Sequence, residues 1–90
     1  IHILSADQKD IAELFARRGD DRFAAIDWAP GQFGAPVIAG AAALFECRAR
    51  SRYVEGDHVI LVGEVERCTS RSGVTPLIFH GGRFCTELPL

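Results

Sequence analysis

Two consecutive stretches with strand patterns, separated by a short turn, constrain the fold of this chain most strongly. From Ala43 to Arg50 apolar and polar residues alternate, which predicts a half-buried strand with Phe45 on one face and Glu46 on the other. Val59 to Val65 is apolar and rich in β-branched residues, which predicts a strand buried on much of both faces. The turn is supplied by Glu55-Gly56-Asp57. The centre of the chain is therefore predicted to be antiparallel sheet.

Further strands are expected on both sides of this region. Leu77 to Phe79 predicts a strand, Gly81-Gly82 can supply a hairpin turn, and Arg83 to Leu88 returns along it. Between Gly19 and Pro36, closely spaced Pro and Gly residues predict loops and a short strand, with the apolar anchors Phe23, Ile26 and Trp28. Turns this short favour a meander or part of a barrel, whose open edge has to be covered by a partner or by further sequence.

One helix precedes the strands. Ser5 to Gln8 has the pattern of a capping box, in which the serine hydroxyl and the glutamine side chain satisfy each other's backbone N–H groups. Residues at helical spacing follow it, and Gly19 is well placed to end the helix. These signals predict one amphipathic helix from Ala6 to Arg18, with the periodic positions Ile11, Leu14, Phe15 and Arg18.

Length and charge exclude several classes of protein. The chain has 90 residues, which allows at most one small domain, and its hydrophobic content of 48% is too high for a disordered tail. Its net charge of −2, with no basic block, argues against a nucleic acid or an anionic membrane surface as partner. No apolar run approaches the length that spans a membrane.

Cys47, Cys68 and Cys85 fit neither a disulfide framework nor a metal site. They are odd in number, widely spaced and without a Cys-x-x-Cys pair. Each has apolar neighbours in the sequence, so we expect all three to be reduced and to pack as small hydrophobic residues. Reduced thiols favour the cytoplasm. No metal ligands are predicted.

Two turn motifs are candidates for binding. His58 follows Gly56-Asp57 and could face a ligand as a neutral ring, although a turn followed by a solvent-facing residue explains the same pattern. The second motif is His80 to Phe84, in which the glycines permit close approach of a flat or charged ligand to the backbone. Arg83 could pair with a phosphate of such a ligand and Phe84 could stack on it. A tight turn between a surface Arg and a core Phe is the simpler interpretation. Neither motif belongs to a catalytic constellation or a dinucleotide fingerprint.

The order of several segments resembles the flavin reductase family, the short-chain NAD(P)H:flavin oxidoreductases of two-component monooxygenases. The resemblance covers essentially all 90 residues. It is carried by Ile3 to Gln8, Leu14-Phe15-Ala16, Gly34 to Ile38, Glu46-Cys47-Arg48, Gly56-Asp57-His58, Val62 to Val65, Pro76 to His80 and Gly82-Arg83-Phe84.

The resemblance implies an α+β fold that is mainly β with one helix, whose antiparallel strands form part of an FMN-binding split β-barrel. It implies that residues 1–90 are the C-terminal portion of one domain whose N-terminal strands are absent. The lack of Met and the apolar start at Ile1 agree with that expectation. His2, on this first strand, is interpreted as a packed or edge histidine rather than a ligand.

Function is also implied by the resemblance: reduction of FMN or FAD by hydride from NADH or NADPH, in a homodimer that supplies reduced flavin to a separate oxygenase. No residue is assigned an acid, base or nucleophile role, because hydride transfer between stacked rings needs orientation and exclusion of water. A non-catalytic flavin-binding or assembly domain of the same barrel is the alternative. The cofactor-binding positions it implies are Ser5, Ala6, Asp7, Gln8 and Phe15 on the flavin side and His58, Gly82, Arg83 and Phe84 near the nicotinamide nucleotide.

Overall fold

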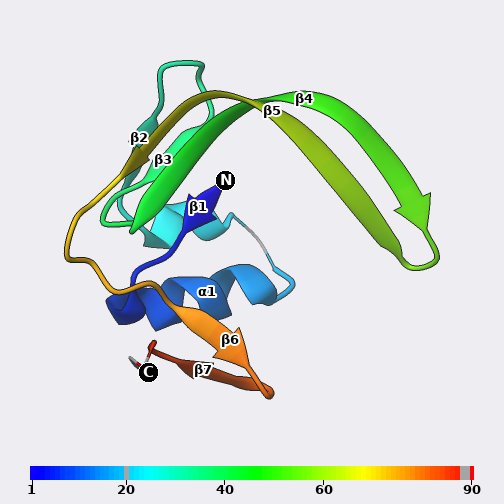
Figure 1. The fold of residues 1–90 in the computed structure, drawn as a ribbon. Helices are drawn as coiled ribbons and strands as arrows, with labels where there is room; N and C mark the ends of the chain where they lie inside the picture. The colour runs from blue at the N-terminus through cyan, green and yellow to red at the C-terminus, as the bar shows by residue number, and fades with distance from the viewer. Residues whose placement is uncertain (20, 88–89) are drawn as a thin grey trace.

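The computed structural model describes residues 1–19, 21–87 and 90. A short first strand, one α-helix and two small hairpins surround the base of one long hairpin (Figure 1). All strand pairs are antiparallel, which confirms the expected mainly β fold with one helix. The elements in chain order are β1 (His2–Ile3), the 3-10 helix η1 (Ala6–Gln8), α1 (Lys9–Ala16), the 3-10 helix η2 (Arg22–Ala25), β2 (Trp28–Pro30), β3 (Pro36–Ile38), β4 (Ala43–Glu55), β5 (His58–Ser70), β6 (Ile78–His80) and β7 (Arg83–Cys85).

The long hairpin is formed by β4 and β5, each of 13 residues. Glu55 pairs with His58, so only Gly56 and Asp57 form the loop. Gly56 has φ +62°, which suits the first loop position of a type II′ turn and confirms the predicted turn. β1 extends the sheet on the other side of β4, with His2 opposite Leu44.

The pairing of β4 with β5 changes register twice, between Glu46 and Cys47 and between Ala49 and Ser51. An extra residue in one strand interrupts the alternation of side chains and bends the ribbon. Glu46, expected on the polar face of a half-buried strand, is only 9% exposed. The expected regular alternation from Ala43 to Arg50 is therefore wrong at these positions.

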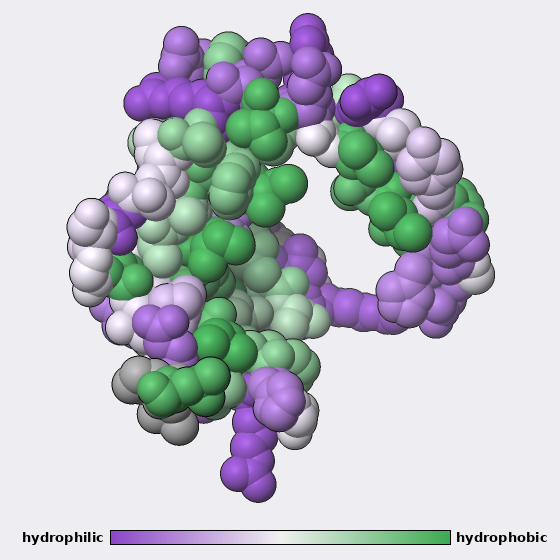
Figure 2. Space-filling model, viewed as in Figure 1, coloured by the Kyte–Doolittle hydropathy of each residue, from purple (hydrophilic) through white to green (hydrophobic). Residues whose placement is uncertain are grey.

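The outer part of the long hairpin, residues 48–65, is called the arm here. It curves away from α1 and from the β6–β7 hairpin (Figure 1). β5 is exposed along its whole length, and Leu61 is 76% exposed. The prediction that Val59 to Val65 is buried on both faces is therefore wrong for the described chain, because the arm projects beyond the other elements. Figure 2 shows an open hollow between the arm and the rest of the molecule, with hydrophobic residues on both sides of it.

The predicted helix is confirmed in position but differs at its ends. Its first turn, Ala6–Gln8, is 3-10, and the α-helix ends at Ala16 because Arg17 is extended, with φ −83° and ψ 150°. The Arg22 guanidinium holds this end by donating from Nε to the Arg17 carbonyl oxygen at 3.0 Å. Gly19 therefore lies beyond the end of the helix and does not terminate it.

The small hairpins follow the predicted turns. β2 pairs with β3 through the Pro30–Pro36 segment, where one short strand was expected. β6 pairs with β7 around Gly81-Gly82, as predicted. β6 lies one residue later than the expected Leu77 to Phe79, and β7 ends at Cys85, before the expected Leu88, which lies outside the described residues. Among the residues that the structure describes, few apolar side chains are buried, and they lie where β3 meets the start of β4: Ile38, Ala41 and Ala42.

Candidate functional site

Ser5 to Gln8, the predicted flavin-side segment, forms the tight turn that starts the helix. The Ser5 N–H donates to Gln8 Oε1 at 3.0 Å, and the Gln8 N–H donates to the Ser5 carbonyl at 2.9 Å. The capping box is confirmed, because the Ser5 side chain also lies at the Gln8 N–H while the Gln8 side chain accepts from the Ser5 N–H. The Ser5 hydroxyl donates to the Asp7 carboxylate. Ser5 is 4% and Gln8 is 7% exposed, so their polar groups are satisfied inside the fold.

A polar cavity of about 550 Å³ lies beside this turn. Three carboxylates, those of Asp7, Asp10 and Asp27, line it together with the guanidinium of Arg71. The excess of negative charge disfavours a phosphate group in this cavity, because like charges repel strongly where water is partly excluded.

Phe15 lies on the face of α1 that meets the η2 segment. Its ring packs edge-on against Phe23, with ring centroids 5.1 Å apart, and Phe23 packs against Trp28 at 5.5 Å. Such edge-to-face pairs add to the energy of apolar burial. Phe15 therefore belongs to an aromatic row that fixes the helix. Of the predicted anchors, Phe23 packs at the centre of this row, whereas Trp28 at its end is 41% exposed.

The β6–β7 hairpin presents the predicted nucleotide-side residues at its tip. Gly81 and Gly82 have φ +60° and +76°, as a type I′ turn requires, and a Cβ added to either would meet nothing within 4 Å. Arg83 is exposed, and Phe84 is half-buried against Phe79 at a centroid distance of 5.0 Å. The tip is therefore open to a flat or charged ligand, with one cation and one aromatic ring beside it.

His58 lies at the far end of the arm. Its Nδ1 is 2.5 Å from Asp57 Oδ1, and its side chain is 81% exposed. The arm carries it away from the β6–β7 hairpin (Figure 1). Within one described chain, His58 is therefore not brought together with the tip formed by Gly82, Arg83 and Phe84. Neither His58 nor this tip shares a pocket with the Ser5–Gln8 turn.

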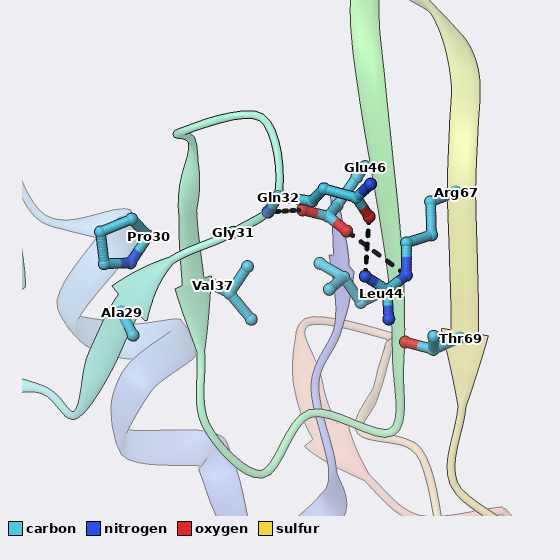
Figure 3. Close-up of a pocket in the computed structure, with 9 residues that line it drawn as sticks. All are labelled: Ala29, Pro30, Gly31, Gln32, Val37, Leu44, Glu46, Arg67 and Thr69. Atoms are coloured by element: carbon cyan, nitrogen blue, oxygen red, sulfur yellow. Dashed lines mark hydrogen bonds and ion pairs between the residues drawn. The ribbon is translucent and has the colours of Figure 1, made fainter.

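A buried carboxylate, Glu46, was not predicted as special. Its Oε1 accepts from the Gln32 N–H at 2.9 Å, its Oε2 lies 3.9 Å from Arg67 Nε, and Arg67 Nη1 donates to Gln32 Oε1 at 2.9 Å. The three side chains point toward one another beside a cavity of about 520 Å³ (Figure 3). This cluster fixes the loop after Gly31 against β4 and β5. The alternation pattern gave no signal for it, since its partners lie far apart in the sequence.

His2 joins two strands. Its Nε2 accepts from the Ile38 N–H at 3.0 Å, so the ring is neutral and carries its proton on Nδ1. Burial, and secondly the ammonium group of Ile1, lower the pKa of His2 from its usual value of 6.5. The interpretation of His2 as a packed histidine is confirmed.

The three cysteines are free, as expected. Cys47 is half-buried, but Cys68 and Cys85 are exposed, so the expectation that all three pack as hydrophobic residues is wrong for these two. Within the described ranges no group of three or more potential ligands is arranged to hold a metal ion. No helix in the described part of the chain is long and apolar enough to cross a membrane.

The described chain is of the α+β class: it is mainly antiparallel β-sheet, with one helix near its N-terminus and glycines at the tips of the β4–β5 and β6–β7 hairpins. Residues 1–87 match the model of the flavin reductase like domain, and the chain belongs to this family. The FMN reductase (NADH) SmoA of Agrobacterium fabrum is 48% identical over 84 residues, which are 93% of this chain and 47% of that protein. The flavin-dependent monooxygenase reductase subunit HsaB of Mycobacterium tuberculosis is 35% identical over 86 residues, 93% of this chain and 46% of that protein.

The fold is also shared with solved structures. The NADH:FAD oxidoreductase SgcE6 of Streptomyces globisporus, in complex with NAD and FAD fragments, matches with a TM-score of 0.89 and 40% identity over 98% of this chain and 54% of that one. The expected flavin reductase split-barrel fold is thereby confirmed. The chain spans about half the length of SmoA and HsaB, 47% and 46%.

Proposed function

We propose that the protein containing this chain transfers hydride from NADH or NADPH to FMN or FAD and supplies the reduced flavin to a separate monooxygenase. The observation that carries the proposal is the match over 98% of the chain to an NADH:FAD oxidoreductase in complex with NAD and FAD fragments. The names of SmoA, an FMN reductase that uses NADH, and HsaB, a monooxygenase reductase subunit, support the same reaction class.

The residues at the tip of the β6–β7 hairpin fit a nicotinamide nucleotide. The side-chain-free surface of Gly81-Gly82 leaves open space for a flat group, and the exposed Arg83 can form charge-assisted hydrogen bonds to a phosphate. Phe84 offers a ring for stacking. In the proposed reaction these residues bind and orient the nucleotide, while flavin, when bound, supplies the hydride-accepting ring.

The flavin-side proposal covers Ser5, Ala6, Asp7, Gln8 and Phe15. The polar groups of Ser5 and Gln8 are engaged within the turn, and Phe15 is engaged in the aromatic row, so their contribution is a shaped and rigid wall. A rigid wall lowers the cost of aligning two rings for hydride transfer. No group in this set has to act as acid, base or nucleophile.

Three further statements belong to the proposal. The 90 residues are the C-terminal portion of one flavin reductase domain; the coverage of 47% of SmoA supports their being part of a longer domain. The protein is a homodimer, which is supported by the exposed apolar side chains of the arm, with Leu61 76% exposed. It works in the cytoplasm, which is supported by the three free thiols.

The test is NAD(P)H oxidation by the complete product of the gene that encodes this chain, with FMN and FAD in turn. Flavin-dependent loss of nucleotide absorbance is expected, together with bleaching of the flavin spectrum in the absence of oxygen. Tight flavin binding without bleaching by either nucleotide would instead identify a non-catalytic flavin-binding domain. The dissociation constant for FMN is then compared between the isolated 90 residues and the complete gene product. The difference measures how much of the flavin pocket the 90 residues contain.

A further inference from the structure

In the described chain, the backbone pairing that joins the β6–β7 hairpin to the start of the helix extends over only a few residues. It forms a two-stranded sheet of its own. The segment leading into it pairs with the start of the helix: the Ala6 N–H donates to the Thr75 carbonyl and the Leu77 N–H donates to the Leu4 carbonyl, each at 2.8 Å. The direction of the hairpin therefore depends on how residues 4–6 are held.

Gln8 holds these residues. Its Oε1 accepts from the Ser5 N–H at 3.0 Å, while its Nε2 donates to the Ala39 carbonyl at 2.7 Å. The side chain lies against Gly40, where an added Cβ would come within 3.1 Å of Nε2. One buried amide group thus connects the turn that bears the β6–β7 hairpin to the β3–β4 loop.

We propose that Gln8 is a positioning residue for the nucleotide side of the site, acting through residues 4–6 and 75–77 on the tip at Gly82, Arg83 and Phe84. This inference rests on the proposed flavin reductase function. Both ends of the Gln8 amide are used within the fold, so Gln8 contributes to the flavin-side wall by shape alone and reaches the nucleotide side through the residues that it holds. Small errors in the placement of reacting rings have large effects on rate.

The kinetic test compares Gln8→Leu with Gln32→Leu in the complete gene product. Both changes remove a glutamine amide, but that of Gln32 bonds Arg67 on the β2–β3 side of the molecule. For Gln8→Leu the KM for the nucleotide is expected to rise about tenfold, and the flavin dissociation constant is expected to rise by a smaller factor. Equal losses of flavin and nucleotide binding would overturn the proposal, because the effect of Gln8 would then not be directed to the nucleotide side.

Gln8→Glu provides a rescue that depends on pH. An ionised carboxylate can accept from the Ser5 N–H but cannot donate to the Ala39 carbonyl, whereas a protonated carboxyl can do both. Burial raises the pKa of a carboxyl, so protonation is accessible in mildly acidic buffer. The KM for the nucleotide in Gln8→Glu, relative to that of the unsubstituted protein, is expected to fall as the pH is lowered. A ratio independent of pH would contradict the donor role.

Amide hydrogen exchange gives a readout that does not require activity. In Gln8→Leu the Ala6 and Leu77 amides are expected to exchange about tenfold faster, while amides paired between β4 and β5 keep their rates. Unchanged exchange at Leu77 would overturn the positioning role even in an active reductase. Faster exchange in a protein that shows no flavin-dependent oxidation would instead refute the proposed function and leave the structural link intact.

Discussion

Glu46 lies directly over Gly31, and the two residues fit only because Gly31 has no side chain. A Cβ at position 31 would collide with Glu46 Oε1 and would come within 2.8 Å of Val37 Cγ2. The Gln32 N–H that follows donates to the same carboxylate oxygen. The glycine therefore allows a buried carboxylate to bind the loop backbone.

Gly31→Ala is expected to lower the free energy of unfolding by about 1–3 kcal/mol, because the added methyl forces Glu46 or the loop to move. Urea unfolding of the complete gene product measures this value. The same substitution in a Glu46→Ala background is the control, and there it should cost less, since one of the two collisions is gone. Equal costs in both backgrounds would contradict the packing of Glu46 on Gly31.

His2 makes stability depend on pH. Because its pKa is lowered in the folded state, the unfolded chain binds this proton more readily, and acid favours unfolding. The contribution of His2 is complete above the unfolded pKa, near 6.5, and is lost as the pH falls through the lower folded value. The free energy of unfolding, measured from pH 8 down to pH 5, should decrease less in His2→Asn, which keeps an acceptor but does not titrate. Parallel curves would refute this role.

His58 and Arg83 lie at the tips of two different hairpins, the arm and the β6–β7 hairpin, which are separated in space (Figure 1). If both serve one nucleotide site in the proposed homodimer, they come from different copies of the chain. His58→Ala and Arg83→Ala should then each lose activity alone, while an equal mixture refolded together regains about a quarter of it, as one intact site forms in half of the dimers. A mixture no more active than its components would contradict a shared site.

Leu61, on the arm, is 76% exposed in the single chain. Burying a leucine side chain is worth about 1.5–3 kcal/mol, and a buried unpaired charge opposes association. Leu61→Arg should therefore raise the dimer dissociation constant at least about tenfold, measured by sedimentation equilibrium. Arg50→Glu, an exposed polar position of the same arm, is the matched control. An unchanged dissociation constant for Leu61→Arg would place the interface elsewhere.

Local signals determined the turns and the start of the helix. The capping box at Ser5 and Gln8, and the glycines at 56 and 81–82, act over two to four residues, so the sequence alone was sufficient to predict them. Alternating and β-branched patterns predicted the main strand segments, and the order of the motifs along the chain predicted the family. The end of the helix was predicted too late, because the extended backbone at Arg17 and the bond from Arg22 had no pattern in the sequence.

Tertiary structure alone decided which polar groups are buried and which apolar groups are not. Contacts with the Gln32 N–H and with Arg67 hold Glu46 inside the fold, next to a change of register between β4 and β5, and the projection of the arm leaves Leu61 exposed. It also made Gln8 a link between the β3–β4 loop and the turn that holds the β6–β7 hairpin. These contacts join residues that are tens of positions apart in the sequence. Their energies depend on the register of the strands and on which elements pack against each face of the sheet, and a local sequence pattern contains neither kind of information.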